Sequence, residues 1–354
     1  MGAYSLFEPS SGNKDNELIM RVLFHAYNCC CQNEGGGVQT RIRRMQNLLT
    51  SKGIQVDFFN PYETKLRDYD VLHIFMLTLE CQQLVDVAKS LGLKVVLSSI
   101  VSIREGRAID FYRRLPRQFT TAVMMKYNQL KKFDTIIAET PAEADFLNKH
   151  YKVPRDKMVI IPNGVDEIGS GGDEIFEKIG CRKKYVLQVG RFDANKNQLN
   201  VIKALKDADY DLVLVGGSNV VGKDTYYDTC LKAAEGSNRI HFLGWIPTGT
   251  PLLNSAYRNA QVVILPSHHE TFGLVATEGA MSGAHVCLSN TLAINGFDVF
   301  DKDYTFNPDD CRDIRRAIDK AMSTPKDDKL RKRAIEVFSW DKIAQQHIDI
   351  YNAK

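Results

Sequence analysis

Residues 262–287, which read VVILPSHHETFGLVATEGAMSGAHVC, constrain the fold of this chain more than any other stretch. The apolar run 262–265 is typical of a fully buried strand, and Pro266 ends it. After a loop, Gly273 precedes small and apolar residues with helical spacing. A buried strand, a loop and a helix in this order predict one unit of an α/β fold with a parallel sheet.

Two carboxylates flank the turn inside this unit. Glu270 lies just before the expected helix, and Glu278 lies within it, eight positions later. Free backbone N–H groups at a helix N-terminus bind anions, and Gly273 lets a ligand approach the backbone closely. Two solvated glutamates are the alternative. The surrounding strand, glycine and helix favour a sugar-nucleotide site, in which amides meet phosphates and carboxylates meet hydroxyls.

The composition excludes several classes of protein. The chain has 354 residues, enough for two domains, and 44% hydrophobic with 25% charged residues excludes wholesale disorder. A net charge of +3 is too small to indicate a nucleic-acid partner. No apolar run approaches the roughly 20 residues of a membrane span, and residues 1–19 lack a signal-peptide pattern. Eight scattered cysteines suit reduced thiols, so we expect a cytoplasmic protein with an N-terminal extension at 1–19.

Strands and helices alternate in both halves of the chain. In the first half we expect strands at 21–26, 55–59, 71–75, 94–97 and 135–138, and in the second half at 185–189, 211–215, 240–243, 262–265 and 285–288. The glycine-rich stretch 163–172 is a plausible hinge. These patterns predict two domains, at 20–167 and 168–339, followed by a helix at 340–354.

Four landmarks in the chain resemble the retaining glycosyltransferases of family 4, which have the GT-B fold. They are the segments 189–192 and 242–245, the block 262–287, and the closing pair Ser339-Trp340. The resemblance implies two Rossmann-like, doubly wound parallel-sheet domains that face each other across a cleft. It also implies that the first domain binds the acceptor and is completed by the helix 340–354, and that the second binds a nucleotide-sugar donor.

The resemblance assigns the donor site to the second domain. Glu270 would contact hydroxyls of the donor sugar, and Glu278 the ribose. The turn around Phe272 would offer its amides to sugar and phosphate. We therefore expect donor contacts at Thr271, Phe272, Gly273, Leu274 and Val275.

A basic loop follows the first strand of the second domain, where ligands of open α/β sheets bind. It contains Gly190, Arg191 and Lys196, and the family holds the donor phosphates at matching positions. A solvated basic loop is the alternative. Cations here would stabilise the departing diphosphate, which makes Arg191, Lys196 and Glu270 the candidate catalytic residues.

Two further donor contacts rest on weaker patterns. Trp245 lies where the family lines the base pocket, although a core or surface aromatic is an equal alternative. Gly36 and Gly37 precede a helix, so their amides are candidates to face the donor across the cleft.

The acceptor side is the least defined part of the sequence. His73 lies near the end of an expected strand, and a satisfied core histidine is the alternative. Where many family members carry a histidine, this chain has Ser98 or Ser99. The resemblance implies a same-face displacement without a protein nucleophile. We expect no metal or other cofactor, because no carboxylate pair is well placed and two cations can replace a divalent ion. The Asp-x-Asp strings at 207–209 and 301–303 suit solvated charges better than metal ligands.

Residues 104–132 are basic and partly amphipathic. Such a surface suits an anionic membrane, a phosphorylated acceptor or an ordinary solvated face, so peripheral contact with the inner face of a membrane is one expectation.

Our leading hypothesis is a retaining glycosyltransferase that moves a sugar from a nucleotide-diphosphate-sugar to a carbohydrate, lipid-linked or small-molecule acceptor. The alternatives are another nucleotide-sugar enzyme of this fold, such as an epimerase or a phosphorylase, or a silent sugar-nucleotide-binding protein. A dehydrogenase is disfavoured because no GxGxxG follows the first strand.

Overall fold

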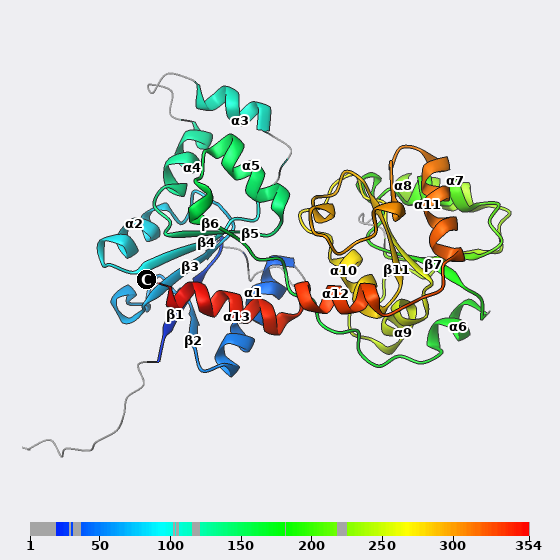
Figure 1. Cartoon of the computed structure of the whole chain (residues 1–354), viewed down its shortest axis with the longest axis horizontal. Coiled ribbons are helices and arrows are strands. Elements are labelled where there is room, and N and C mark those ends of the chain that lie inside the picture. The colour runs from blue at the N-terminus through cyan, green and yellow to red at the C-terminus, as the bar shows by residue number, and fades with distance from the viewer. Residues whose placement is uncertain are drawn as a thin grey trace, which may run out of the picture.

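Two six-stranded parallel sheets form the frame of the molecule (Figure 1). The computed structural model describes residues 19–27, 30, 37–101, 103, 106–114, 121–180, 182–217 and 225–353. The first sheet has the order β2-β1-β3-β4-β5-β6 and the second the order β12-β11-β10-β7-β8-β9. The strands of the first sheet are β1 Arg21–His25, β2 Gln55–Phe58, β3 Val71–Phe75, β4 Lys94–Ser98, β5 Thr135–Ala138 and β6 Met158–Ile160. Those of the second are β7 Tyr185–Val189, β8 Asp211–Val215, β9 Ile240–Phe242, β10 Val262–Leu265, β11 His285–Ser289 and β12 Thr305–Phe306.

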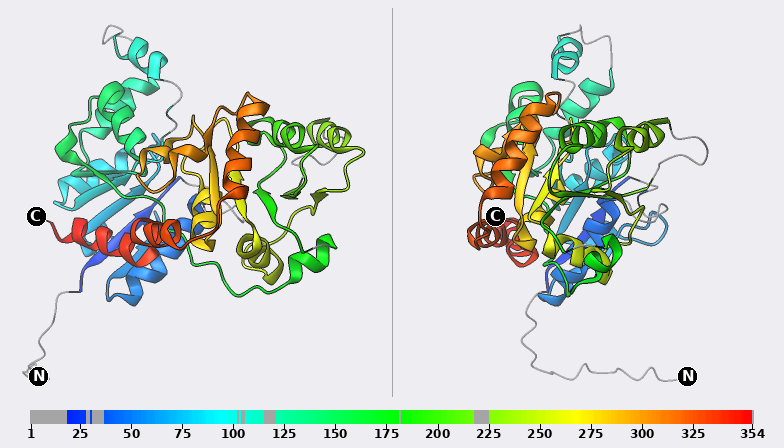
Figure 2. Two further views of the ribbon diagram at one scale, coloured as in Figure 1. Left: turned by 45° about the vertical axis from the view of Figure 1, so that its right-hand side comes forward. Right: turned by 90° about the vertical axis from the view of Figure 1, so that its right-hand side faces the viewer.

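Helices cover both faces of each sheet, as a doubly wound fold requires (Figure 2). The helices that precede the second sheet are α1 Gly37–Ser51, α2 Gln82–Ser90, α3 Gly106–Arg113, α4 Ala122–Leu130, α5 Pro141–Tyr151 and α6 Glu174–Ile179. The helices that follow are α7 Gln198–Leu205, α8 Thr225–Ala234, α9 Pro251–Asn259, α10 Leu274–Ser282, α11 Cys311–Ser323, α12 Lys329–Phe338 and α13 Trp340–Asn352. Over the described residues, no helix is both long and apolar enough to span a membrane.

The two-sheet α/β architecture expected from the sequence is confirmed, and every expected strand is present. The sequence reading missed β6 and β12. Both are edge strands of two or three residues, and β6 leaves Val159 and Ile160 more than one-third exposed. Strands this short show no hydrophobic periodicity, so their place is set by pairing with a longer neighbour.

The last helix, α13, belongs to the core of the first sheet although it follows the second one in sequence. Its Ile343 and Tyr351 are buried together with Phe24 and Met45. Figure 1 shows α13 in red, lying along the N-terminal half, with α12 between the two halves.

The chain crosses between the two halves twice, and the two crossings lie side by side. The amide of Val165 donates to the carbonyl of Phe338 over 2.9 Å, and Val165 forms an isolated β-bridge with Ser339. A Cβ atom at Gly164 would lie 2.3 Å from the ring of Trp340, so only glycine permits this approach. The first crossing lies within the hinge expected from the sequence.

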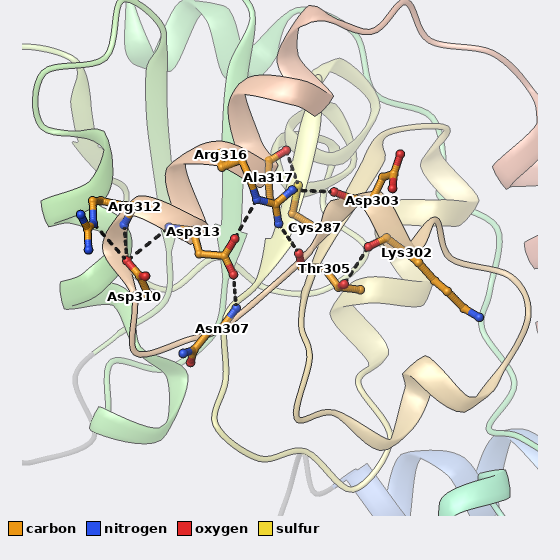
Figure 3. A network of polar contacts seen from close by, with 10 residues as sticks. All are labelled: Cys287, Lys302, Asp303, Thr305, Asn307, Asp310, Arg312, Asp313, Arg316 and Ala317. Atoms are coloured by element: carbon orange, nitrogen blue, oxygen red, sulfur yellow. Dashed lines mark hydrogen bonds and ion pairs between the residues drawn. The ribbon is translucent and has the colours of Figure 1, made fainter.

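A polar network attaches the edge of the second sheet to α11 (Figure 3). The guanidinium of Arg316 donates to the carbonyl of Thr305 in β12 over 2.7 Å and to a carboxylate oxygen of Asp313 over 2.7 Å. The other oxygen of Asp313 accepts from the amide of Asn307 over 2.7 Å. These bonds occupy polar groups at a strand too short to hold itself in place.

Candidate active site

A cavity of about 520 Å³ lies between the two halves of the molecule, and both halves line it. The first half contributes apolar side chains together with a buried arginine, a glutamate and an asparagine. The second half contributes the loops that follow β7 and β10 and the start of α10. The lining residues are Val38, Arg41, Met76, Ile100, Glu139, Asn163, Lys196, Leu265, Glu270, Thr271, Phe272, Gly273, Leu274 and Val275.

An ion pair between Lys196 and Glu270 forms the polar part of the C-terminal wall. Lys196 Nζ lies 2.5 Å from Glu270 Oε1, and both side chains are largely but not fully buried. Lys196 follows β7 and Glu270 follows β10, and these strands are neighbours in the sheet. Because parallel strands end at the same edge, two predicted site residues 74 positions apart meet.

Hydrogen bonds hold the two loops of this wall together. Asn195 Nδ2 donates to the carbonyl of His269 over 2.9 Å, and the amide of His268 donates to the carbonyl of Asn195 over 2.9 Å. Gln188 Nε2 donates to the carbonyl of Lys196 over 2.8 Å. Sequence reasoning gave Asn195 and Gln188 no role, although Asn195 lies within the predicted loop.

Gly273 permits the close approach of α10 to this wall. Its φ is +107°, and a Cβ atom there would lie 3.1 Å from a methyl group of Leu265. The amides of Leu274 and Val275 are the first of the helix, so they have no acceptor within it. Since both residues line the cavity, the N-terminal end of α10 faces the space between the two halves.

A second cavity, of about 510 Å³, continues along the hinge. Glu278 and Leu274 line it from α10, with Asn163 at the hinge and Thr248 after β9. The Tyr257 hydroxyl donates to Glu278 Oε2 over 2.5 Å. Burial raises the pKa of Glu278, which the bond from Tyr257 partly offsets. The structure therefore places the two predicted carboxylates in different cavities, whose linings share Arg41, Asn163 and Leu274.

Of the other predicted donor contacts, Gly190, Arg191 and Trp245 lie outside these linings. Arg191 is exposed at the end of β7, next to Gly190, and lines neither cavity. Trp245 is 72% exposed and also lines neither. Gly37 is the first residue of α1, whereas Gly36 lies outside the described residues.

A buried ion pair forms the polar part of the N-terminal wall. Arg41 of α1 pairs with Glu139, which follows β5, and both side chains are almost completely buried. Burial lowers the pKa of Arg41 to about 10, an effect that the charge of Glu143 opposes. Sequence reasoning missed this pair. The rule that ligands bind after strand ends points to Glu139, and Arg41 lies four residues into the helix that follows the glycine loop.

His73, Ser98 and Ser99, the predicted acceptor-side residues, do not line the cavity. All three are completely buried. The Nδ1 atom of His73 lies 2.7 Å from the Tyr351 hydroxyl, and Nε2 lies 3.0 Å from Ser98 Oγ. Ser99 Oγ donates to Glu143 Oε1 over 2.7 Å. In this conformation their polar groups bond to the protein interior, so the structure favours the core-histidine alternative for His73.

The segment 104–132 is only partly described, because 104, 105 and 115–120 lie outside the described residues. Phe111 and Tyr112 of α3 are 62% and 42% exposed, beside Arg107. Contact with an anionic membrane through this surface stays a prediction. Within the described ranges, no group of three or more His, Cys, Asp or Glu could hold a metal ion.

Comparison with known proteins agrees with this geometry. Residues 62–167 match the model of Glycosyltransferase Family 4, and residues 173–337 match that of Glycosyl transferases group 1. The chain belongs to the family 4 glycosyltransferases. An uncharacterized glycosyltransferase of Methanocaldococcus jannaschii is 28% identical over 230 residues, which are 57% of this chain and 55% of that protein.

Two other relatives extend the comparison. The D-inositol 3-phosphate glycosyltransferase of Corynebacterium glutamicum is 33% identical over 171 residues, 43% of this chain and 40% of that protein. The chain thus matches about half the length of these relatives or less. The structure of Anabaena HepE in complex with UDP-glucose matches 94% of this chain and 99% of that one, with a TM-score of 0.68 and 16% identity. At that identity the likeness shows the fold, which is GT-B.

Proposed function

We propose that this chain is a retaining, metal-independent glycosyltransferase that moves a sugar from a nucleotide-diphosphate-sugar to an acceptor hydroxyl. The observation that carries the proposal is the composition of the C-terminal wall of the first cavity. There a lysine, a carboxylate and the open N-terminal end of a helix face one space of about 520 Å³. The lysine and the helix amides suit a diphosphate, and the carboxylate suits sugar hydroxyls.

Donor binding would exchange partners within this wall. The diphosphate would form an ion pair with Lys196 and accept hydrogen bonds from the amides of Leu274 and Val275. Arg191, at the end of β7, would also contact it. Glu270 would then be released from Lys196 to accept hydrogen bonds from the donor sugar. In the second cavity Glu278 would accept from ribose hydroxyls.

The transfer step would keep the configuration of the sugar. The bond between the anomeric carbon and the diphosphate oxygen breaks, and the bond to the acceptor oxygen forms on the same face. The acceptor proton goes to the departing diphosphate. Lys196 and Arg191 offset the negative charge that develops on the leaving group, which is how this site would act without a divalent cation.

The relatives guide the choice of first substrates. HepE was solved with UDP-glucose, which makes uracil the first base to test. A Corynebacterium relative is named for D-inositol 3-phosphate, which makes polyols and sugars, free or phosphorylated, the first acceptors to test. Lipid-linked acceptors form the next class.

The test begins with thermal unfolding in the presence of UDP, GDP, ADP and their glucose or mannose conjugates. A true donor stabilises the folded state. Turnover of that donor is then followed with and without excess EDTA, and NMR reports the anomeric configuration of the product. Absence of any stabilisation contradicts the proposal, and loss of activity in EDTA contradicts metal independence. Binding without hydrolysis or transfer favours the silent-binder alternative.

A further inference from the structure

We infer that Arg41, Glu139 and Asn163 form the acceptor subsite of the first cavity, and that it holds an uncharged, hydroxyl-bearing ring such as a sugar or a polyol. This inference rests on the proposed function and deepens it. It assigns the acceptor to residues that sequence reasoning did not select, in place of the buried His73, Ser98 and Ser99.

The first argument is unused hydrogen-bonding capacity at buried atoms. Arg41 is 3% exposed, Glu139 is 4% exposed and Asn163 is 8% exposed, and all three line the cavity. Over the described part of the chain, Arg41 Nε and Nη2 donate no hydrogen bond, and Asn163 Oδ1 accepts none. Arg41 and Asn163 also line the second cavity, so they lie where the two cavities meet. Unsatisfied buried polar atoms are rare and costly, so their gathering at this place points to a ligand.

The second argument is charge. Among the described residues, the cavity lining carries two cations, Arg41 and Lys196, and two carboxylates, Glu139 and Glu270, so the formal charges of these four side chains cancel. Behind it, Glu143 already accepts from Ser99 Oγ over 2.7 Å and from the amide of Val101 over 2.8 Å. A donor diphosphate would make this space negative. A phosphorylated acceptor would therefore meet repulsion, whereas a neutral one would not.

The third argument is the match of donors and acceptors. The subsite offers N–H groups of Arg41 that donate no hydrogen bond, an oxygen of Asn163 that accepts none, and the Glu139 carboxylate in the cavity lining. A hydroxyl group both donates and accepts, so neighbouring hydroxyls on one ring can serve both kinds of atom. A phosphate or a carboxylate accepts only and would leave Asn163 Oδ1 unpaired.

An apolar surface lies beside these polar atoms. Met76 and Ile100, which follow β3 and β4, line the same cavity together with Val38. Both have positive φ, +77° and +44°, which is uncommon for residues other than glycine and clusters at functional sites. The C–H face of a sugar or polyol ring can pack on this surface while its hydroxyls reach the polar atoms.

The experiment measures binding of neutral rings to the protein saturated with nucleoside diphosphate. UDP is used first to saturate the protein. If wild type binds GDP or ADP more tightly, that diphosphate is used instead. D-glucose, D-mannose and myo-inositol, each beside its monophosphate, are titrated into wild type, Asn163→Ala and the double variant Arg41→Gln/Glu139→Gln. The double variant removes the buried charges as a pair, so neither charge is left alone. Arg43→Gln, an exposed arginine of α1, and Asp145→Asn, an exposed carboxylate of α5, are the matched controls.

We expect at least one neutral ring to bind wild type, with its dissociation constant raised about tenfold or more in both test variants. The controls should match wild type throughout. If the double variant does not fold, Asn163→Ala decides alone.

Three results would overturn the inference. They are wild-type sugar affinity in the variants, no binding of any neutral ring to diphosphate-bound wild type, and tighter binding of the monophosphates that depends on Arg41. The proposed function fails separately, if wild type binds none of the three diphosphates. Sugars titrated into the ligand-free protein would then still report on the subsite.

Discussion

The two walls of the central cavity are built in opposite ways. The C-terminal wall consists of strand-end loops, and its ion pair, Lys196–Glu270, keeps side chains that are 21% and 16% exposed. The N-terminal wall is centred on Arg41–Glu139, whose side chains are 2% and 6% exposed. The first pair can exchange partners with a ligand at small cost, whereas the second is part of the folded interior. One wall is arranged to change on binding, and the other to stay fixed.

The same contrast explains which wall the sequence revealed. The residues of the C-terminal wall lie in two short motifs, 190–197 and 270–278, so their chemistry is visible in local spacing. The N-terminal wall gathers Arg41, Glu139 and Asn163 from α1, the end of β5 and the hinge. Only tertiary packing brings such distant residues together.

The largest expected effect is on stability, when each wall loses its cation. Arg41→Met leaves the Glu139 carboxylate buried without its partner, and breaking a buried pair costs about 3–5 kcal/mol of unfolding free energy. Lys196→Met should cost about 1 kcal/mol or less, because Glu270 can turn toward solvent. Urea unfolding of both variants beside wild type measures the difference. Equal losses would remove the distinction between a fixed wall and an exchangeable one.

The second-largest expected effect is a loss of stability at acid pH, which originates in the N-terminal half. His347 of α13 is completely buried near Arg41, and its Nδ1 atom lies 2.7 Å from the carbonyl of Ile343. Burial lowers the pKa of His347 from 6.5 to about 4. The unfolded chain therefore takes up a proton first as the pH falls, so stability is complete above pH 6.5 and declines between about 6.5 and 4.

That difference in pKa corresponds to roughly 3 kcal/mol across the window. Urea unfolding at intervals from pH 7 to pH 4.5 should show the decline, and His347→Gln should make it shallower. The adjacent His73, whose pKa burial also lowers, contributes in the same direction and remains in the variant. A wild-type curve that stays flat from pH 6.5 to pH 4.5 would show that neither histidine is held neutral.

Most of the fold could be predicted from the sequence, because buried parallel strands appear as apolar runs such as 262–265 and 211–215. The edge strands β6 and β12 could not, since their positions depend on pairing. His73 shows the limit for the site. It follows an apolar strand pattern whether it faces a cleft or the interior, and only the contact with Tyr351, 278 residues away, separates the two.

Affinity for the diphosphate should depend on the C-terminal wall and not on an exposed arginine of the N-terminal half. Lys196→Met removes a charge-assisted contact to phosphate and should weaken diphosphate binding by about 1.5–3 kcal/mol, roughly 10- to 100-fold. Calorimetric titration of the preferred diphosphate measures this. Arg43→Gln in α1 is the control and should bind like wild type. Unchanged affinity in Lys196→Met would exclude this lysine from the phosphate site.

The smallest effect distinguishes the two predicted carboxylates of the C-terminal half. Glu270 and Glu278 line different cavities, so a ligand that extends from one to the other would meet them with different parts. If Glu270 holds the donor sugar, its partner is absent from the bare diphosphate. Glu270→Gln should then keep diphosphate affinity and weaken binding of the complete donor by about 1 kcal/mol, because a neutral amide oxygen replaces the charged acceptor. If Glu278 holds the ribose, which both ligands carry, Glu278→Gln should weaken both by the same factor.

The two variants titrated in parallel with diphosphate and donor give four dissociation constants. Equal losses for both ligands in both variants would contradict the separate roles, and with them the placement of sugar and ribose in the two cavities.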